Sequence, residues 1–238
     1  MGRRRRAVVS ARASALPITA RPWRGRRWLV LAPHPDDETL GVGALIAQTA
    51  ASACFAGLVY LTDGSGSHPA HEERAGRLIA TRKREAALAL RRLTNDTFRS
   101  PIFLGWKDAA PAMKGDAAFD RSCRTLAALC RRLRVDILAT TTINEPHCDH
   151  VAAAELASAV QSMSRGRIAI AEYVVWGQAP PVRTHRALVT APVSPGVRRR
   201  ALAAHRSQLT AAFGAGFRLP PDKRAMAARD LLYVRKAS

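Results

Sequence analysis

The stretch WLVLAPHPDDETLGVGALIA, residues 28–47, decides both the fold class and the candidate chemistry of this chain. Its first residues, Trp28–Leu31, form an apolar run that predicts a buried strand, and the alanine-rich segment 39–53 predicts a helix. Four titratable side chains lie between them: His34, Asp36, Asp37 and Glu38. Acidic residues favour a helix N-terminus, but that role explains neither the histidine nor the two prolines. Because such close like charges repel each other, the cluster indicates a bound cation.

The rest of the chain alternates between strand-like and helix-like segments. Further strands are expected over 54–61, 101–104, 135–140, 168–175 and 187–190, and further helices over 72–93, 119–133, 151–163 and 195–209. This alternation predicts an α/β fold, a mostly parallel sheet with helices on both faces. Ligands of such folds lie beyond the carboxyl ends of the strands. We therefore expect the polar segments 34–38, 63–71 and 144–150 to converge at one edge of the sheet.

A second cluster, Pro146–His150, places His147 and His150 three residues apart at the start of a predicted helix. Histidines at this spacing can face one site, although surface pairs of this kind are common. Together the two clusters offer two histidines and one aspartate to a metal and leave one position open, which is the pattern of a catalytic zinc site. A second carboxylate that is not a ligand would then act as the general base.

Four segments together resemble the family of de-N-acetylases that includes N-acetylglucosaminyl-phosphatidylinositol deacetylases (PIG-L) and LmbE-like proteins. They are APHPDDETLGVGALIA at 32–47, RKRE at 82–85, PHCDH at 146–150 and HRSQ at 205–208, and their order and spacing match over residues 27–210. The resemblance implies a Rossmann-like three-layer sandwich and a hydrolase that removes an acetyl group from an amino sugar. The loop after the second strand lacks the glutamate that many members carry, and this departure leaves the substrate open.

The resemblance also implies a role for each matching residue. His34, Asp37 and His150 are the expected ligands of Zn²⁺ or, alternatively, Fe²⁺. Asp36 is the expected general base, and His147 is expected to polarise the carbonyl or stabilise the oxyanion. Substrate contacts are expected from Arg82, His68, Ser65 and His205, and outer positions around the metal site from Asp149 and Glu38.

The chain is strongly basic, with a formal net charge of +20. Residues 1–30 contain nine arginines and no acidic residue, and we expect 1–26 to be a disordered tail before a single domain over 27–238. An organellar transit peptide is the open alternative, whereas the absence of an apolar region after Arg3–Arg6 argues against a secretory signal. The four cysteines form no C-x-x-C pair, which favours a reducing, cytoplasmic location.

The expected function is metal-dependent hydrolysis of the acetamide of an N-acetylglucosamine-type or related small-molecule or glycan substrate, and whether that substrate is anionic stays open. The alternatives are a non-catalytic metal-bound protein and a nucleic-acid-binding protein, which the basic charge supports but the 5% aromatic content does not. A dinucleotide-binding fingerprint starting at Gly41 fails because Ile46 occupies its last glycine position. The sequence contains no apolar run long enough for a transmembrane helix and does not indicate an oligomeric state.

Overall fold

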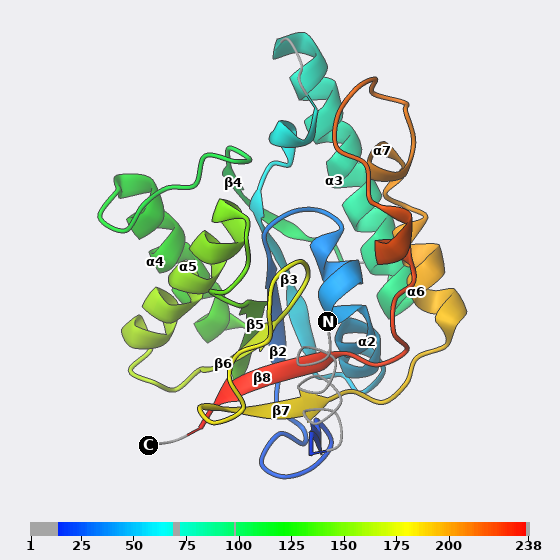
Figure 1. The fold of residues 1–238 in the computed structure, drawn as a ribbon. Helices are drawn as coiled ribbons and strands as arrows, with labels where there is room; N and C mark the ends of the chain where they lie inside the picture. Colours follow the sequence, from blue (N-terminus) through cyan, green and yellow to red (C-terminus); the bar gives the residue numbers. More distant parts are fainter. Residues whose placement is uncertain (1–13, 69–71, 98, 237–238) are drawn as a thin grey trace.

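The computed structural model describes residues 14–236 except 69–71 and 98, and the described chain is built around one eight-stranded sheet (Figure 1). The strand order is β1-β7-β8-β6-β5-β2-β3-β4. All neighbouring strands are parallel except the two pairs that β8 makes with β6 and β7. The strands are β1 Leu16–Pro17, β2 Trp28–Ala32, β3 Phe55–Thr62, β4 Ile102–Trp106, β5 Ile137–Thr141, β6 Ala169–Tyr173, β7 His185–Val189 and β8 Leu231–Arg235. The expected α/β class with a mostly parallel sheet is confirmed.

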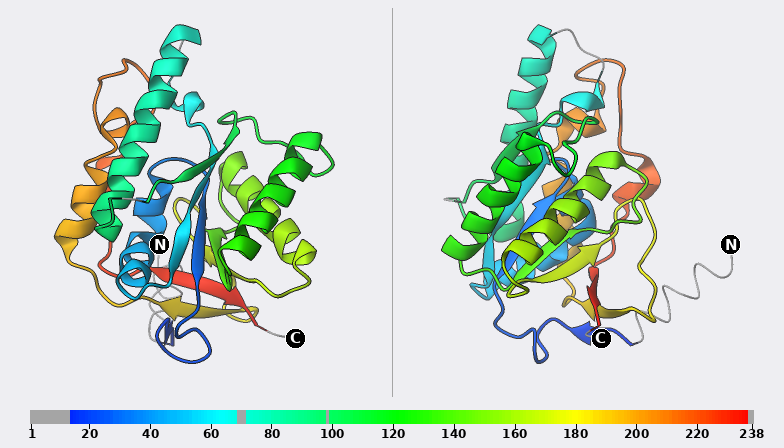
Figure 2. Two further views of the ribbon diagram at one scale, coloured as in Figure 1. Left: turned by 180° about the vertical axis from the view of Figure 1, so that it is seen from behind. Right: turned by 90° about the vertical axis from the view of Figure 1, so that its left-hand side faces the viewer.

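Helices cover both faces of the sheet, as the two views of Figure 2 also show. One face is covered by α2 Asp37–Ala51, α3 Glu72–Thr94, α6 Pro195–Leu202 and α7 Arg206–Leu209, and the other by α4 Ala117–Arg132 and α5 Cys148–Met163. Short 3-10 turns lie at Ser65–Ser67 and Pro221–Arg224. Among the described residues, no helix is both long and apolar enough to cross a membrane.

Strand β2 is buried on both faces, which explains why its sequence is continuously apolar. Trp28 and Val30 pack into the core beneath α2 and α3, whereas Leu29 and Leu31 pack into the core beneath α4 and α5. Its neighbours in the sheet are β3 and β5. The polar segments that follow these three strands therefore emerge side by side, as the sequence predicts.

Two elements differ from the expected pattern. The helix expected over 195–209 is broken into α6 and α7, and the turn between them carries His205. Strand β8 was not expected, and it inserts between β6 and β7. Its residues Leu231–Val234 form a short apolar run that is compatible with a strand, but the run was not included in the expected pattern.

The disordered tail expected over residues 1–26 needs a correction. Residues 1–13 lie outside the described residues, but 14–26 do not form a separate tail. Strand β1 pairs with β7 in parallel, and Ile18 is buried in the core at 5% exposure. The arginines of this segment misled the prediction because a short strand can join a sheet through backbone hydrogen bonds whatever its flanking charges.

Gly41 lets the first turn of α2, which begins with Asp37, pack directly against β6. A Cβ at this position would lie 2.4 Å from a ring carbon of Tyr173. Because the Tyr173 hydroxyl donates to the Leu31 carbonyl at 3.2 Å, the ring has little freedom to move away.

We expect Gly41→Ala to lower the free energy of unfolding by about 1–3 kcal/mol, because an extra carbon in a packed interface must displace the helix or the ring. The matched control is Gly76→Ala in α3, where a Cβ would meet no atom within 4 Å. That change should be neutral or stabilising by about 1 kcal/mol, since alanine is the better helix former. Equal denaturation midpoints for the two variants would contradict the packing argument.

Candidate metal centre

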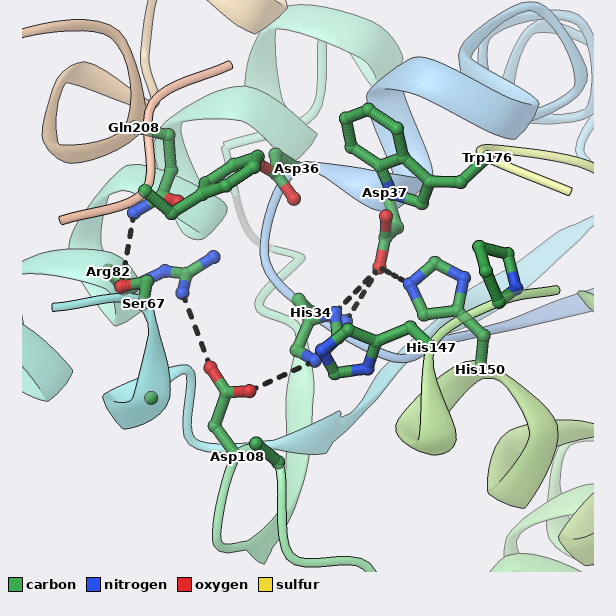
Figure 3. Close-up of a pocket in the computed structure, with 14 residues that line it drawn as sticks. His34, Asp36, Asp37, Ser67, Arg82, Asp108, His147, His150, Trp176 and Gln208 are labelled. Carbon is green, nitrogen blue, oxygen red and sulfur yellow. Dashed lines mark hydrogen bonds and ion pairs between the residues drawn. The ribbon is translucent and has the colours of Figure 1, made fainter. Parts of the chain in front are cut away.

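The loops that follow β2, β3, β4 and β5 meet at the carboxyl edge of the sheet and enclose a cavity of about 390 Å³ (Figure 3). The convergence follows from parallel strand order, because neighbouring strands end at the same edge. Six of the predicted site residues line this cavity: His34, Asp36, Asp37, Arg82, His147 and His150. The sequence therefore predicted which residues come together, and their roles stay predictions.

His34, Asp37 and His150 are arranged as a set of metal ligands. One carboxylate oxygen of Asp37, Oδ2, lies 3.1 Å from His34 Nδ1 and 3.2 Å from His150 Nε2. Two ligand atoms bound tetrahedrally to one zinc ion, each about 2.0–2.1 Å from it, are about 3.3 Å apart. The donor set and its spacing therefore fit a zinc-sized ion that would be held by these three residues.

The second nitrogen of His34 is held by two carboxylates. His34 Nε2 lies 2.9 Å from Asp149 Oδ2 and 3.2 Å from Asp108 Oδ1. A metal-binding histidine commonly donates its other N–H to a carboxylate, which fixes the ring and its tautomer. The placement of Asp149 agrees with the outer position expected for it. Sequence reasoning missed Asp108, although it follows β4 at the same edge of the sheet and could have been found by that position.

Asp36 has the properties of a residue held in place for function. Its backbone is strained, with φ of 125° in a region that favours glycine, and its side chain lines the cavity. Burial and the neighbouring Asp37 carboxylate raise its pKa to about 7. A bound cation would lower that pKa again, and a base with a pKa near the working pH is efficient at proton transfer.

Glu38 and His205 lie beneath Asp36 and are fully buried. Glu38 accepts a hydrogen bond from the Asp36 backbone N–H at 2.9 Å, and its other oxygen lies 3.0 Å from His205 Nε2. Although burial favours the neutral forms, the attraction between the two groups lowers the pKa of Glu38 and raises that of His205. Glu38 thus supports the strained Asp36 backbone, in agreement with its expected outer position.

His147 points one nitrogen at the backbone and leaves the other free for the cavity. Its Nδ1 accepts a hydrogen bond from the Asp149 N–H at 3.3 Å at the start of α5. Burial and the nearby His34 lower its pKa, which favours the neutral ring. With Nδ1 accepting, the proton of that neutral ring is on Nε2, so His147 can donate a hydrogen bond.

Sequence reasoning also missed Glu145, a buried carboxylate behind His150. Glu145 Oε2 lies 3.4 Å from His150 Nδ1. The same carboxylate accepts backbone N–H bonds from Val175 at 2.6 Å, Trp176 at 3.0 Å and Gly177 at 3.0 Å. It therefore connects a candidate metal ligand to the segment after β6. The only signal in the sequence was its place within the polar segment after β5.

Three of the four expected substrate contacts do not line the cavity, and this part of the prediction is corrected. His205 has no exposed surface, and His68 is buried against Gly216. Ser65 lies in the loop after β3, where Gly66 and Ser67 reach the cavity instead. The sequence pattern predicts which edge of the sheet each residue lies at, but not how deeply its side chain is buried.

Arg82 does line the cavity, but its guanidinium is largely committed to the protein. It donates to the carbonyl oxygens of Gly64 at 2.8 Å and Pro35 at 2.7 Å. Arg82 thereby ties the loop after β3 to the loop that carries Asp36. The expected contact with substrate hydroxyl or phosphate groups is therefore secondary to a role in holding these two loops.

Comparisons with known proteins agree with this geometry. A family profile described as PIG-L, GlcNAc-PI de-N-acetylase, matches residues 29–161. No curated protein matches the chain in sequence.

Several solved structures share the fold. N,N'-diacetylchitobiose deacetylase from Pyrococcus horikoshii superposes with a TM-score of 0.58 at 19% identity, over 78% of this chain and 71% of that one. The zinc-inhibited form of teicoplanin deacetylase Orf2 superposes with a TM-score of 0.61 at 15% identity, over 89% and 99%. GalB, a 4-carboxy-2-hydroxymuconate hydratase from Pseudomonas putida, also superposes, with a TM-score of 0.52 at 14% identity over 77% and 80%. At these identities the likeness concerns the fold alone.

Metal binding should release a proton and should weaken as the pH falls. Although burial opposes protonation, Asp37 raises the pKa of His150 to about 9, so this ring carries a proton at neutral pH in the metal-free protein. The ring must lose that proton to bind a metal. Calorimetric titration with Zn²⁺ in buffers of different ionisation enthalpy should reveal the release. Zinc affinity that does not change between pH 6 and pH 8 would contradict this expectation.

Glu145→Gln should weaken metal binding by about 10–100-fold, because an amide no longer provides a full carboxylate behind His150. The NH₂ group of the introduced amide would also face the backbone N–H donors of residues 175–177, and two donors cannot form a hydrogen bond with each other. The matched control is Glu155→Gln on the exposed side of α5, which should bind zinc like the wild type. Competition with a chromophoric chelator measures the affinities, and equal values for the two variants would exclude the proposed support.

Proposed function

The chain belongs to the PIG-L de-N-acetylase family, and on this premise we propose that it is a metal-dependent hydrolase that removes the acetyl group from an N-acetylated amino sugar. The family description and the N,N'-diacetylchitobiose deacetylase with the same fold support an amino-sugar substrate. Zn²⁺ is the proposed metal, and its ligands are His34, Asp37 and His150. The His/Asp donor set would also accept Fe²⁺.

One observation carries this proposal: two adjacent aspartates have separate environments. Asp37 contacts both histidine ligands, whereas Asp36 faces the cavity and makes no contact with them. The backbone distortion at Asp36 separates the two side chains. A non-catalytic metal protein requires the ligands but gains nothing from a strained, buried second carboxylate, so the arrangement favours catalysis.

Amide hydrolysis needs an activated water, a stabilised oxyanion and a proton for the leaving amine. A bound zinc ion would lower the pKa of a water ligand towards about 7. Asp36 is positioned to accept the proton of the attacking water and, with a pKa raised by burial, to pass it to the amine nitrogen. The Nε2–H of His147 would donate to the carbonyl oxygen as negative charge develops on it.

The first test is acetate release from a panel of N-acetylglucosamine derivatives by zinc-loaded protein. Asp36→Asn should lower kcat by about 10²–10⁴-fold, since general-base catalysis contributes about that factor. The variant should retain zinc because Asp36 is not one of the three ligands. Asp120→Asn on the exposed side of α4 is the matched control and should release acetate at the wild-type rate.

Two results would reject parts of the proposal. A fully active Asp36→Asn protein would exclude Asp36 as the base. Wild-type protein that binds zinc but releases no acetate from any member of the panel would exclude amino-sugar deacetylation. Addition of water to an unsaturated acid would then be the next reaction to assay, because GalB has the same fold.

A further inference from the structure

We propose that the substrate carries an uncharged apolar group next to the amino sugar, an aryl or alkyl aglycone, and that this group packs against Trp176 and Phe217. The proposal rests on the proposed function, because it places the remainder of a deacetylase substrate in the same cavity. The two rings are named below as the aromatic wall.

The aromatic wall lies in the catalytic cavity itself. Trp176, in the segment after β6, and Phe217, in the segment after α7, both line the cavity that contains Asp36 and His147. Trp176 is labelled in Figure 3. Their ring centroids are 6.0 Å apart, and the rings meet edge to face at 85°. Phe217 is 41% exposed. An exposed aromatic side chain at the rim of a catalytic cavity provides apolar surface that a ligand can cover.

Both rings are held in place through their backbones. The Trp176 N–H donates to the buried Glu145 carboxylate at 3.0 Å, and the Phe217 N–H donates to the Ser67 carbonyl at 2.7 Å. The ammonium of Lys223 lies 4.8 Å from the centre of the indole ring and donates to the Val175 carbonyl at 2.9 Å. Because the wall is ordered before a ligand arrives, binding costs little conformational entropy there.

The charged side chains that line the cavity argue against an anionic substituent; Lys223, beside the indole ring, is not one of them and already donates to the Val175 carbonyl. Among the described residues that line the cavity, Arg82 is the only lysine or arginine. Both terminal nitrogens of Arg82 already donate to backbone carbonyls, and its nearest acid is Asp108 at 3.8 Å. The remaining charged side chains that line the cavity are aspartates and histidines. A phosphate or nucleotide next to the sugar would therefore face carboxylates, whereas an uncharged apolar group would meet the aromatic wall.

The experiment compares deacetylation of four substrates by the zinc-loaded full chain. They are free N-acetylglucosamine, its phenyl and octyl β-glycosides, and its 1-phosphate. The wild-type KM for each apolar glycoside should be at least about tenfold below that for the free sugar, as burial of a ring-sized apolar surface predicts. In Phe217→Ala and Trp176→Ala, the ratio of the KM for the free sugar to the KM for each apolar glycoside should fall towards one. Phe213→Ala, which removes a ring of the same segment that does not line the cavity, should keep the wild-type ratio.

Every outcome bears on one of the two proposals. Absence of acetate release from all four substrates would reject the deacetylase function itself. Acetate release with equal KM values for the free sugar and the glycosides, or with the lowest KM for the 1-phosphate, would reject the aromatic wall and leave the function standing. A wild-type ratio retained in both wall variants would also reject it. Because Phe217 is partly exposed, Phe217→Ala remains a valid test if the tryptophan variant fails to fold.

Discussion

The site depends on the contact of one carboxylate oxygen, Asp37 Oδ2, with both His34 and His150. The three residues come from the carboxyl ends of β2 and β5, which are neighbours in the sheet. Four further carboxylates, of Asp36, Asp108, Asp149 and Glu145, surround them within a buried volume. So many acids can be buried together only because imidazoles and backbone N–H groups compensate their charge, and a divalent cation would add to that compensation.

The location of the site could be predicted from the sequence because it follows from two simple rules. Apolar runs identify buried parallel strands, and parallel strands place their following loops at one edge. The extent to which each side chain is buried was harder to predict. His205 lies in a segment that resembles a family motif, yet it is fully buried against Glu38 instead of facing the cavity. Asp108 was missed because its partners are distant in sequence. Glu145 lies in the expected polar segment 144–150, but the backbone N–H groups that it accepts from belong to residues 175–177.

The deacetylases and the hydratase that share this fold show how little the fold alone says about the reaction. Two local features narrow the possible reactions: a strained aspartate lies beside a candidate metal ligand, and a hydrogen bond with the backbone sets the tautomer of His147. The proposed contact with an apolar aglycone is a separate matter, since it lies on segments after β6 and α7 that contribute none of the proposed metal ligands.

The position of β8 has a consequence for the order in which the protein can assemble. Among the described residues β8 is the last strand along the chain, yet it alone connects β7 and β1 to the rest of the sheet. Asp230, directly before it, accepts the Leu45 backbone N–H at 2.8 Å and pairs with Arg198, which links α2 to α6. During synthesis on a ribosome, the edge of β6 therefore stays unpaired until residues 231–235 emerge. The edge of β6 is therefore exposed from the synthesis of residues 169–173 until residues 231–235 are available, and this late period is when chaperones would matter most.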